Sequence, residues 1–358
     1  MTIKNVNCFS IKKVCFHILA LGAVVFVGKF IWPTKSAPAH RAFYHWSTTW
    51  NPSATIIQSI SENSIDTLYL RFFDVSWDPI TNKPVPVAPL AFVSPIPQNL
   101  NFIPVVYLKN EVFTKIKPEA ISLLAGNIWA KILAMSTKNN LSFQELQIDC
   151  DWTDGSRKIF FAFVEEIKNL AHARHKSISA TIRLHQIKYR KITGIPPVDR
   201  GMLMFYNVGK LSTDSQKSSI FNLDDAKKYA DYIRSYPMEL DLVLPIFSWG
   251  IQTRDDHIVS LIDRLSLGEA ESNNLFAKTG ENRYEVKDSS FLHGSFFAKG
   301  DRLIFETMSP SKTDEAAKLA LSNLPQNGYR TLAFFDLNER NLKNYAASDF
   351  KSILNRFQ

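Results

Sequence analysis

Glu145-Leu-Gln-Ile-Asp-Cys-Asp-Trp-Thr153 has the composition of a buried strand that ends in two carboxylates, and this segment is the strongest indication of the fold class. Alternate residues of a strand share a face, so Gln147, Asp149 and Asp151 point to one side and the apolar residues between them point to the other. An acidic inner face and an apolar outer face suit the wall of a parallel barrel. The alternative is a pair of structural carboxylates satisfied by buried Arg or Tyr partners.

Strand-like runs alternate with helix-like runs from residue 42 onward. This alternation is typical of an α/β chain with a parallel sheet and crossover helices, and eight repeats predict a closed (β/α)8 TIM barrel over residues 42–358. The runs are residues 42–46, 67–73, 102–108, 146–151, 178–185, 202–207, 242–249 and 331–337. Residues 251–330 predict an insertion between strands seven and eight, with a hairpin at 284–306. We expect it to be too short and interrupted to build a core of its own.

Residues 1–32 have the pattern of an export signal. Lys12 and Lys13 precede an apolar run over residues 14–28. This run reaches the length of a transmembrane helix if Lys29 snorkels to the interface, which predicts a signal anchor. A cleaved signal peptide is the alternative.

Lysines before such a run stay in the cytoplasm. A polar linker over residues 33–41 follows the apolar segment. We therefore expect the barrel to lie on the outer side of the membrane, in the periplasm or cell envelope, with the N-terminal segment as its membrane partner.

Composition excludes several function classes. The 358 residues are 45% hydrophobic and 12% aromatic, which is enough to bury one large core. The net charge of +8 comes partly from lysines around the N-terminal apolar segment, and no basic patch interleaved with aromatic residues occurs elsewhere. We therefore expect no nucleic-acid partner. The three cysteines form no CxxC pair or zinc spacing, and His45 and His185 have no informative spacing, so we expect no metal and no cofactor.

The predicted carboxyl ends of the strands are rich in polar and aromatic residues, and in a TIM barrel these ends form the mouth. Tryptophan rings near carboxylates suit sugars, whose apolar faces pack on aromatic planes while their hydroxyls need polar partners. The alternative for Trp46, Trp77 and Trp249 is packing at the rim. The candidate carbohydrate-binding residues are Trp46, Arg71, Asp74, Arg183, His185, Gln186, Tyr206, Asn207 and Trp249.

Two of these strands resemble motifs of the family-18 chitinases. Residues 146–153 resemble D-G-x-D-x-D-x-E, and Met204-Phe-Tyr-Asn207 resembles M-x-Y-D. The resemblance implies a barrel and a carbohydrate substrate, but Thr153 stands where the family has its proton-donating Glu, and Leu146 and Asn207 each replace an Asp. The strings at residues 147–153, 183–186, 194–198 and 247–250 also resemble a family of uncharacterised exported bacterial barrels, which implies a bacterial source.

Hydrolysis of a glycosidic bond needs an acid and a second carboxylate, about 5 Å apart for retention or about 6.5–9.5 Å apart for inversion. We expect Asp149 to be a structural partner of Arg71 or Arg183, and Asp151 to meet the substrate. A threonine hydroxyl cannot donate a proton near neutral pH, so another acid must replace the family's Glu. The candidates are Asp336 first and Glu306 second, then Asp74, Asp154 and Glu339.

Other reaction classes lack their motifs: the sequence has no G-x-S-x-G elbow, no phosphate-binding glycine loop and no H-E-x-x-H. The sequence therefore predicts an exported, glycoside-hydrolase-like barrel that acts on a carbohydrate through mouth carboxylates, Asp149, Asp151, Asp336 and Glu306. The alternative is a non-catalytic carbohydrate-binding barrel that has lost its acid. A purely structural envelope protein would leave the polar mouth unexplained.

Overall fold

The computed structural model describes residues 40–213, 216–325 and 331–357. Its central sheet is a closed ring of eight parallel strands, because β1 pairs with both β18 and β3. The strands in ring order are β1 (His40–His45), β3 (Thr67–Asp78), β6 (Asn101–Leu108), β7 (Glu145–Asp149), β8 (Ser177–Arg183), β9 (Arg200–Met204), β10 (Leu240–Pro245) and β18 (Thr331–Phe335). The predicted (β/α)8 barrel is confirmed. The predicted membrane segment, residues 1–32, lies outside the described residues.

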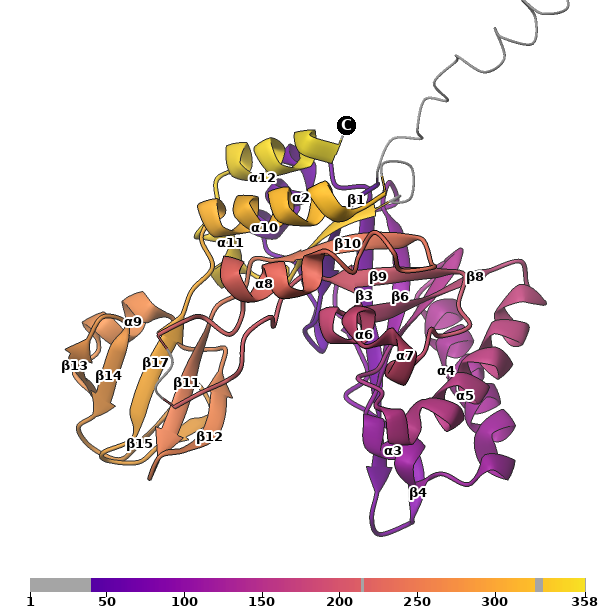
Figure 1. Cartoon of the computed structure of the whole chain (residues 1–358), viewed down its shortest axis with the longest axis horizontal. Coiled ribbons are helices and arrows are strands. Elements are labelled where there is room, and N and C mark those ends of the chain that lie inside the picture. Colours follow the sequence, from indigo (N-terminus) through magenta and orange to yellow (C-terminus); the bar gives the residue numbers. More distant parts are fainter. Residues whose placement is uncertain (1–39, 214–215, 326–330, 358) are drawn as a thin grey trace, which may run out of the picture. The chain divides into compact units, whose positions relative to one another are not determined.

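Amphipathic helices follow the strands. They are α2 (Ala54–Glu62), α4 (Ile121–Lys138), α5 (Asp154–His172), α8 (Leu223–Ala230), α10 (Pro310–Asn323) and α12 (Ala347–Leu354), with the short helices α3 (Asn110–Lys115), α6 (Leu184–Lys188), α7 (Arg190–Thr193) and α11 (Glu339–Leu342). Figure 1 shows α4 and α5 side by side on one flank of the barrel. On α5, Phe160, Phe163 and Ile167 recur at helical spacing and are buried, so the apolar stripe seen in the sequence is the face that packs inward.

By length and composition, the segment Pro118–Lys138 is the one helical stretch of the described residues that could cross a membrane. Its apolar residues Ile121, Leu124, Ile128 and Ile132 are nevertheless buried. They belong to the main hydrophobic cluster of the barrel. We therefore interpret α4 as a core helix of the barrel.

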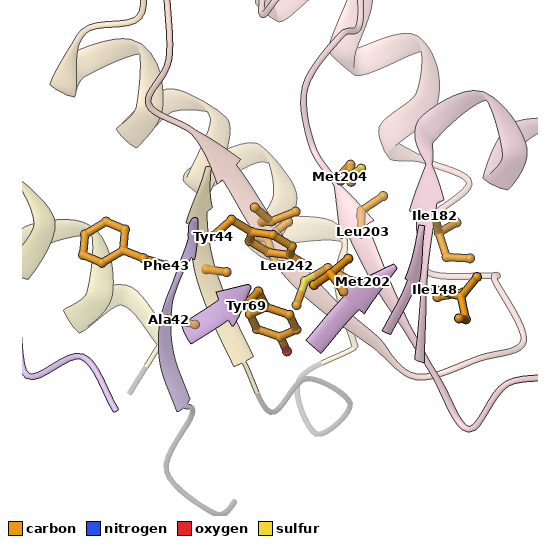
Figure 2. Packing of buried hydrophobic residues seen from close by; sticks show 14 of the residues in the cluster. Ala42, Phe43, Tyr44, Tyr69, Ile148, Ile182, Met202, Leu203, Met204 and Leu242 are labelled. Carbon is orange, nitrogen blue, oxygen red and sulfur yellow. The ribbon is translucent and has the colours of Figure 1, made fainter. Parts of the chain in front are cut away.

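The lumen of the barrel is filled by side chains in layers, and Figure 2 shows Tyr44 and Tyr69 there, with Phe43 on the opposite side of β1. The rings of Tyr44 and Tyr69 stack with their centroids 4.5 Å apart. The Tyr44 hydroxyl donates a hydrogen bond of 2.6 Å to Gln147, whose amide donates to the Ser179 hydroxyl at 3.2 Å. Gln147 thus points inward as its strand alternation predicts, and the lumen below the mouth is closed by packing.

The insertion between β10 and β18 has more structure than the sequence indicated. A five-stranded antiparallel sheet runs in the order β12 (His257–Ile262), β11 (Trp249–Arg254), β17 (Arg302–Glu306), β14 (Arg283–Val286) and β13 (Phe276–Gly280). Helix α9 (Leu267–Ser272) and the hairpin of β15 (Ser290–Leu292) and β16 (Ser295–Phe297) complete it. The expectation that this segment lacks a core is wrong: Ile262, Phe276, Phe297 and Phe305 belong to a second hydrophobic cluster, because the sheet buries one face against its own hairpin and helix.

Several predicted strand ends shift in the structure. Strand β7 ends at Asp149, so Asp151 lies in the loop that follows it. Helix α6 begins at Leu184, which places His185 on a helix and not on the predicted strand, and Gln186 follows on the same helix. The predicted run 242–249 divides into β10 and the start of β11. Each shift occurs where the chain leaves the barrel, and side-chain alternation alone does not mark that point.

Candidate active site

A cavity of about 550 Å³ opens at the carboxyl ends of the barrel strands. We call it the mouth cavity. It is bordered both by barrel residues and by residues of the insertion. The predicted site residues that line it are Trp46, Asp149, Asp151, Arg183, Tyr206, Asn207, Trp249 and Asp336, whereas Arg71, Asp74, His185, Gln186 and Glu306 do not.

Arg183 contacts both Asp149, at the end of β7, and Asp151, in the loop that follows it. Its Nε donates to Asp151 at 2.5 Å, and its Nη2 lies 3.4 Å from Asp149. Asp149 is only 2% exposed and also accepts a 2.5 Å hydrogen bond from the Thr181 hydroxyl. By contrast, half of the Asp151 side chain is exposed. The geometry therefore agrees with the expected roles of the two acids: Asp149 is a buried partner of Arg183, and Asp151 is open to a ligand.

The charges of this cluster depend on one another. Burial raises the pKa of Asp149, and Arg183 opposes that rise. Burial alone would lower the pKa of Arg183, but Asp149 and Asp151 raise it above its ordinary value. Burial raises the pKa of Tyr206 as well, with Arg183 opposing. The Tyr206 hydroxyl therefore stays protonated and can donate a hydrogen bond to a ligand.

Arg71 does not pair with Asp149, and this part of the sequence prediction is wrong. Its Nε donates to Asp74 at 2.6 Å, its Nη2 donates to the same carboxylate, and its Nη1 donates to the backbone oxygen of Trp46 at 3.1 Å. The guanidinium also lies over the Trp46 ring, 5.4 Å from the ring centroid. Because Asp74 is three residues away on the same strand, it satisfies Arg71 locally. The pair supports Trp46 from outside the cavity.

Asp336 lies at the end of β18 and lines the mouth cavity. Its two carboxylate oxygens accept hydrogen bonds from the backbone N–H of Trp46 at 3.1 Å and from the Asn338 amide at 3.0 Å. Burial raises the pKa of Asp336; these hydrogen bonds and His45 oppose the rise, and the carboxylate of Asp263 adds to it. A carboxylic acid with a raised pKa at the edge of a polar cavity is suited to donate a proton.

Glu306 is a structural carboxylate and not a mouth acid. It is buried and accepts hydrogen bonds from the Ser219 backbone N–H at 2.9 Å and the Ser219 hydroxyl at 2.6 Å. It also accepts one from the backbone N–H of Ile220 at 3.3 Å and one from the Trp249 indole at 3.0 Å. Sequence proximity to Phe305 suggested an acid in an apolar setting, but these donors occupy the carboxylate. Its effect on the cavity is to orient Trp249.

Thr153 caps helix α5. Its backbone N–H donates to the Ser156 hydroxyl at 2.9 Å, and its own hydroxyl accepts from the Asn110 amide at 3.4 Å. The position where the chitinases carry a glutamate is thus used here to satisfy a helix N-terminus. It does not line the mouth cavity, and neither do the other candidate acids Asp154 and Glu339.

His185 and Gln186 lie beside the site without lining it. His185 is exposed on α6, and burial together with Arg183 lowers its pKa, with Asp151 opposing. Gln186 is buried and accepts from the Arg183 backbone N–H at 2.8 Å, so it fixes the turn that carries Arg183. In the described part of the chain, no three His, Cys, Asp or Glu side chains gather in a way that could hold a metal ion.

Aromatic rings form the walls of the mouth cavity. Trp46 packs against Phe335 at 5.5 Å between ring centroids, Tyr206 stacks on Phe335 at 5.6 Å, and Phe247 packs against Trp249 at 5.3 Å. Trp77 lies outside the cavity, so rim packing is the correct interpretation for that residue. Trp46 and Trp249 are only partly buried and offer ring surface to a ligand.

Sequence reasoning missed two charged residues that line the cavity, Asp263 and Arg340. Asp263 follows the apolar strand β12 of the insertion, and Arg340 lies on α11. Asp263 follows a strand-like apolar run in the same way as Asp151, and this sequence pattern could have identified it as a candidate site residue. No local sequence feature indicated that the end of β12 would lie at the barrel mouth.

Comparison with known proteins places the fold among chitinase-like barrels. No family model and no curated protein matches the chain. The solved structures it resembles include the C-terminal domain of a putative chitinase from Desulfitobacterium hafniense (TM-score 0.56, 12% identity, 90% of this chain and 99% of that one). Another is the spore cortex-lytic enzyme SleL of Bacillus megaterium (TM-score 0.54, 11% identity, 91% of this chain and 76% of that one). A third is a chitinase from Chromobacterium violaceum (TM-score 0.52, 9% identity, 89% of this chain and 98% of that one). At these identities the likeness concerns the fold alone: the chain is a (β/α)8 barrel, as these structures are.

Proposed function

We propose that this protein is an exported glycoside hydrolase that cleaves a glycan held in the mouth cavity, with Asp336 as the proton donor. The observation that carries the proposal is the cavity itself, in which Trp46 and Trp249 flank a carboxylic acid whose pKa is raised. Aromatic planes and polar groups together are what a sugar ring requires. The names of the similar structures, chitinases and a cortex-lytic enzyme, support the same substrate class.

The residues of the mouth cavity have different roles in the proposed reaction. Asp336 protonates the leaving oxygen of the glycosidic bond, because its raised pKa keeps the acid form available. Asp151 is half-exposed at the cavity and pairs with Arg183 at 2.5 Å, and its carboxylate stabilises the positive charge that develops on the sugar ring. Tyr206 donates a hydrogen bond to a ring substituent. Asp149 acts through Arg183 and is a positioning residue.

A non-catalytic carbohydrate-binding barrel is the second candidate, and two observations favour it. Thr153, at the position of the chitinase proton donor, serves as a helix cap. Arg183 contacts both Asp149 and Asp151, so the remaining acids of that motif are already paired. Under this alternative the cavity binds a glycan and leaves it intact.

The first test measures binding and cleavage together. Full-length protein is applied to a glycan array, and the release of reducing ends is followed for each glycan that binds. The proposal expects turnover in the wild type and a loss of at least about a hundredfold in Asp336→Asn, as for removal of a general acid. Asp231→Asn, an exposed acid outside the cavity, is the matched control. Binding without any turnover in the wild type would establish the second candidate.

The second test uses Thr153→Glu. A carboxylate near a helix N-terminus is favourable, and the capping N–H of residue 153 belongs to the backbone, so the variant is expected to fold. If Asp336 is the donor, the added glutamate leaves turnover dependent on Asp336. Hydrolysis of chito-oligosaccharides that appears only in Thr153→Glu would instead identify a decayed site.

A further inference from the structure

A second cavity adjoins the mouth. It has a volume of about 630 Å³ and lies between β17 and the segments that begin α9, α10 and α11. We call it the side cavity. Ser248, Trp249, Asp263, Arg340 and Asn341 line both cavities. Because the two cavities share five wall residues, they are neighbouring parts of one cleft.

Trp249 is the aromatic residue that lines both cavities. Its ring is held from behind by the 3.0 Å hydrogen bond of the indole nitrogen to Glu306 and by Phe247. The floor of the side cavity adds apolar surface from Leu265, Phe305 and Met308. A rigid aromatic ring beside an apolar floor favours the packing of a second sugar.

In the described part of the chain, no hydrogen bond and no ion pair within 4 Å involves the Arg340 side chain, and its charge acts at longer range on Glu269, whose pKa it helps to lower. Arg340 is only partly exposed. An arginine cannot lose its proton, and a partly buried charge with no partner in direct contact is unfavourable. A ligand that brings an anionic group into the side cavity would therefore be stabilised by Arg340, through the charge-assisted hydrogen bonds that a guanidinium forms with a carboxylate.

The surrounding charges indicate on which side of Trp249 the anionic group would lie. The mouth cavity carries the carboxylates Asp149 and Asp151 and the acid Asp336 against one arginine, Arg183, besides the shared Asp263 and Arg340, so it disfavours an anion. In the side cavity, Lys343 adds a second cation.

The two acids of the side cavity, Glu269 and Asp263, do not reverse the preference of an anionic group for the side cavity. Glu269 accepts hydrogen bonds of 2.9 Å from both the backbone N–H and the hydroxyl of Ser266 and pairs with His293 at 3.4 Å. Asp263 lies at the boundary, close enough to Asp336 to raise the pKa of that residue. The N-terminus of the 14-residue helix α10 also faces the side cavity through Ser309 and Pro310, and its dipole favours negative charge.

We propose that the side cavity is a second sugar subsite in which Arg340 recognises a carboxylate carried by the glycan. This inference rests on the proposed carbohydrate function of the mouth. The ligand class is an oligosaccharide in which a neutral sugar occupies the mouth cavity and an adjoining acidic sugar occupies the side cavity. Arg340 would thus determine specificity without taking part in bond cleavage.

The test compares two probes with the same backbone. One is chitotetraose, and the other is a β-1,4-linked N-acetylated tetrasaccharide in which alternate sugars carry a lactyl carboxylate. Full-length detergent-solubilised protein is titrated with each by calorimetry. We expect the acidic probe to bind more tightly to the wild type, and Arg340→Ala to weaken it by roughly ten- to a hundredfold while changing chitotetraose less than about twofold.

Two controls accompany the titrations. Arg174→Ala removes an exposed arginine on another face and should change neither affinity, and 1 M salt should shrink the preference because the Debye length falls to about 3 Å. Equal affinity of the wild type for both probes, or an equal loss for both in Arg340→Ala, would overturn the subsite while leaving the proposed function intact. Failure of both probes to bind the wild type would overturn the proposed function and the subsite together.

Discussion

Asp149 and Asp151 are two residues apart, yet their surroundings give them different roles. Asp149 is enclosed by Thr181 and Arg183, and Asp151 shares Arg183 from the solvent side. We expect Asp149→Ala to lower the free energy of unfolding by about 3 kcal/mol, at the low end of the range for breaking a buried pair because Asp151 remains beside Arg183. Asp151→Asn should cost less than about 1 kcal/mol. Urea unfolding of both variants is the measurement, and equal losses would mean that the two roles are assigned wrongly.

Asp336 and Asp263 form the other acidic pair at the mouth, and their coupling predicts a pH effect. Burial and the negative charge of Asp263 raise the pKa of Asp336. Asp336 is therefore protonated, and competent as an acid, at pH values below that raised pKa, and kcat/KM should fall as pH rises through it. Asp263→Asn removes one cause of the rise, so the alkaline limb of the kcat/KM profile should move to lower pH.

The same pair has a consequence for stability. Because the folded pKa of Asp336 is raised, its contribution to stability is fully present below the unfolded pKa of about 3.9 and is lost as pH rises through the folded pKa. NMR titration of the Asp336 carboxyl carbon reads this pKa without requiring turnover. If the pKa of Asp336 is unchanged in Asp263→Asn, the charge of Asp263 does not affect Asp336, and this prediction is wrong.

At the scale of elements, the insertion sheet determines how Trp249 is presented to the cleft. Trp249 and Glu306 are cross-strand neighbours on β11 and β17, and the Glu306 carboxylate also binds the Ser219 backbone N–H. Glu306→Gln would leave at least one of these N–H donors facing an amide NH2. We expect a loss of about 1–3 kcal/mol in unfolding free energy and a severalfold weaker affinity for chitotetraose, measured by urea unfolding and calorimetry. Glu285→Gln, an exposed change on the same insertion, should alter neither.

For the whole molecule, we propose that the barrel is carried to the outer side of a membrane by the N-terminal segment. Lys12 and Lys13 followed by the apolar run over residues 14–28 are the features that support this orientation. Fractionation of expressing cells should recover the protein with the membranes, and protease should reach the barrel only from the outer side. Deletion of residues 14–28 should leave it in the cytosol. Full-length wild type in the cytosolic fraction would contradict the proposal.

The parts of the site that could be predicted lie on single strands. The alternation in residues 145–153 indicated the inward direction of Gln147 and Asp149 because side-chain direction along a strand is a local property. The same logic placed Trp46, Tyr206 and Asp336 at the mouth, where the structure has them. It failed for Arg71, which has a local partner in Asp74, and for Glu306, whose donors are the Trp249 indole on β11 and a loop 86 to 88 positions earlier in the chain.

Hydrophobic periodicity reports which face of each element is buried, so the (β/α)8 fold and the strand ends that form its mouth could be predicted from the amino-acid pattern. Which charged side chains meet depends on tertiary contacts that this pattern does not contain. Trp46 reaches Asp336 across 290 positions, and the insertion brings Asp263 to the same cavity while Arg340 stands between two cavities. Such contacts depend on how the insertion sheet packs beside the barrel mouth, and the periodicity of a single element contains no information about that placement.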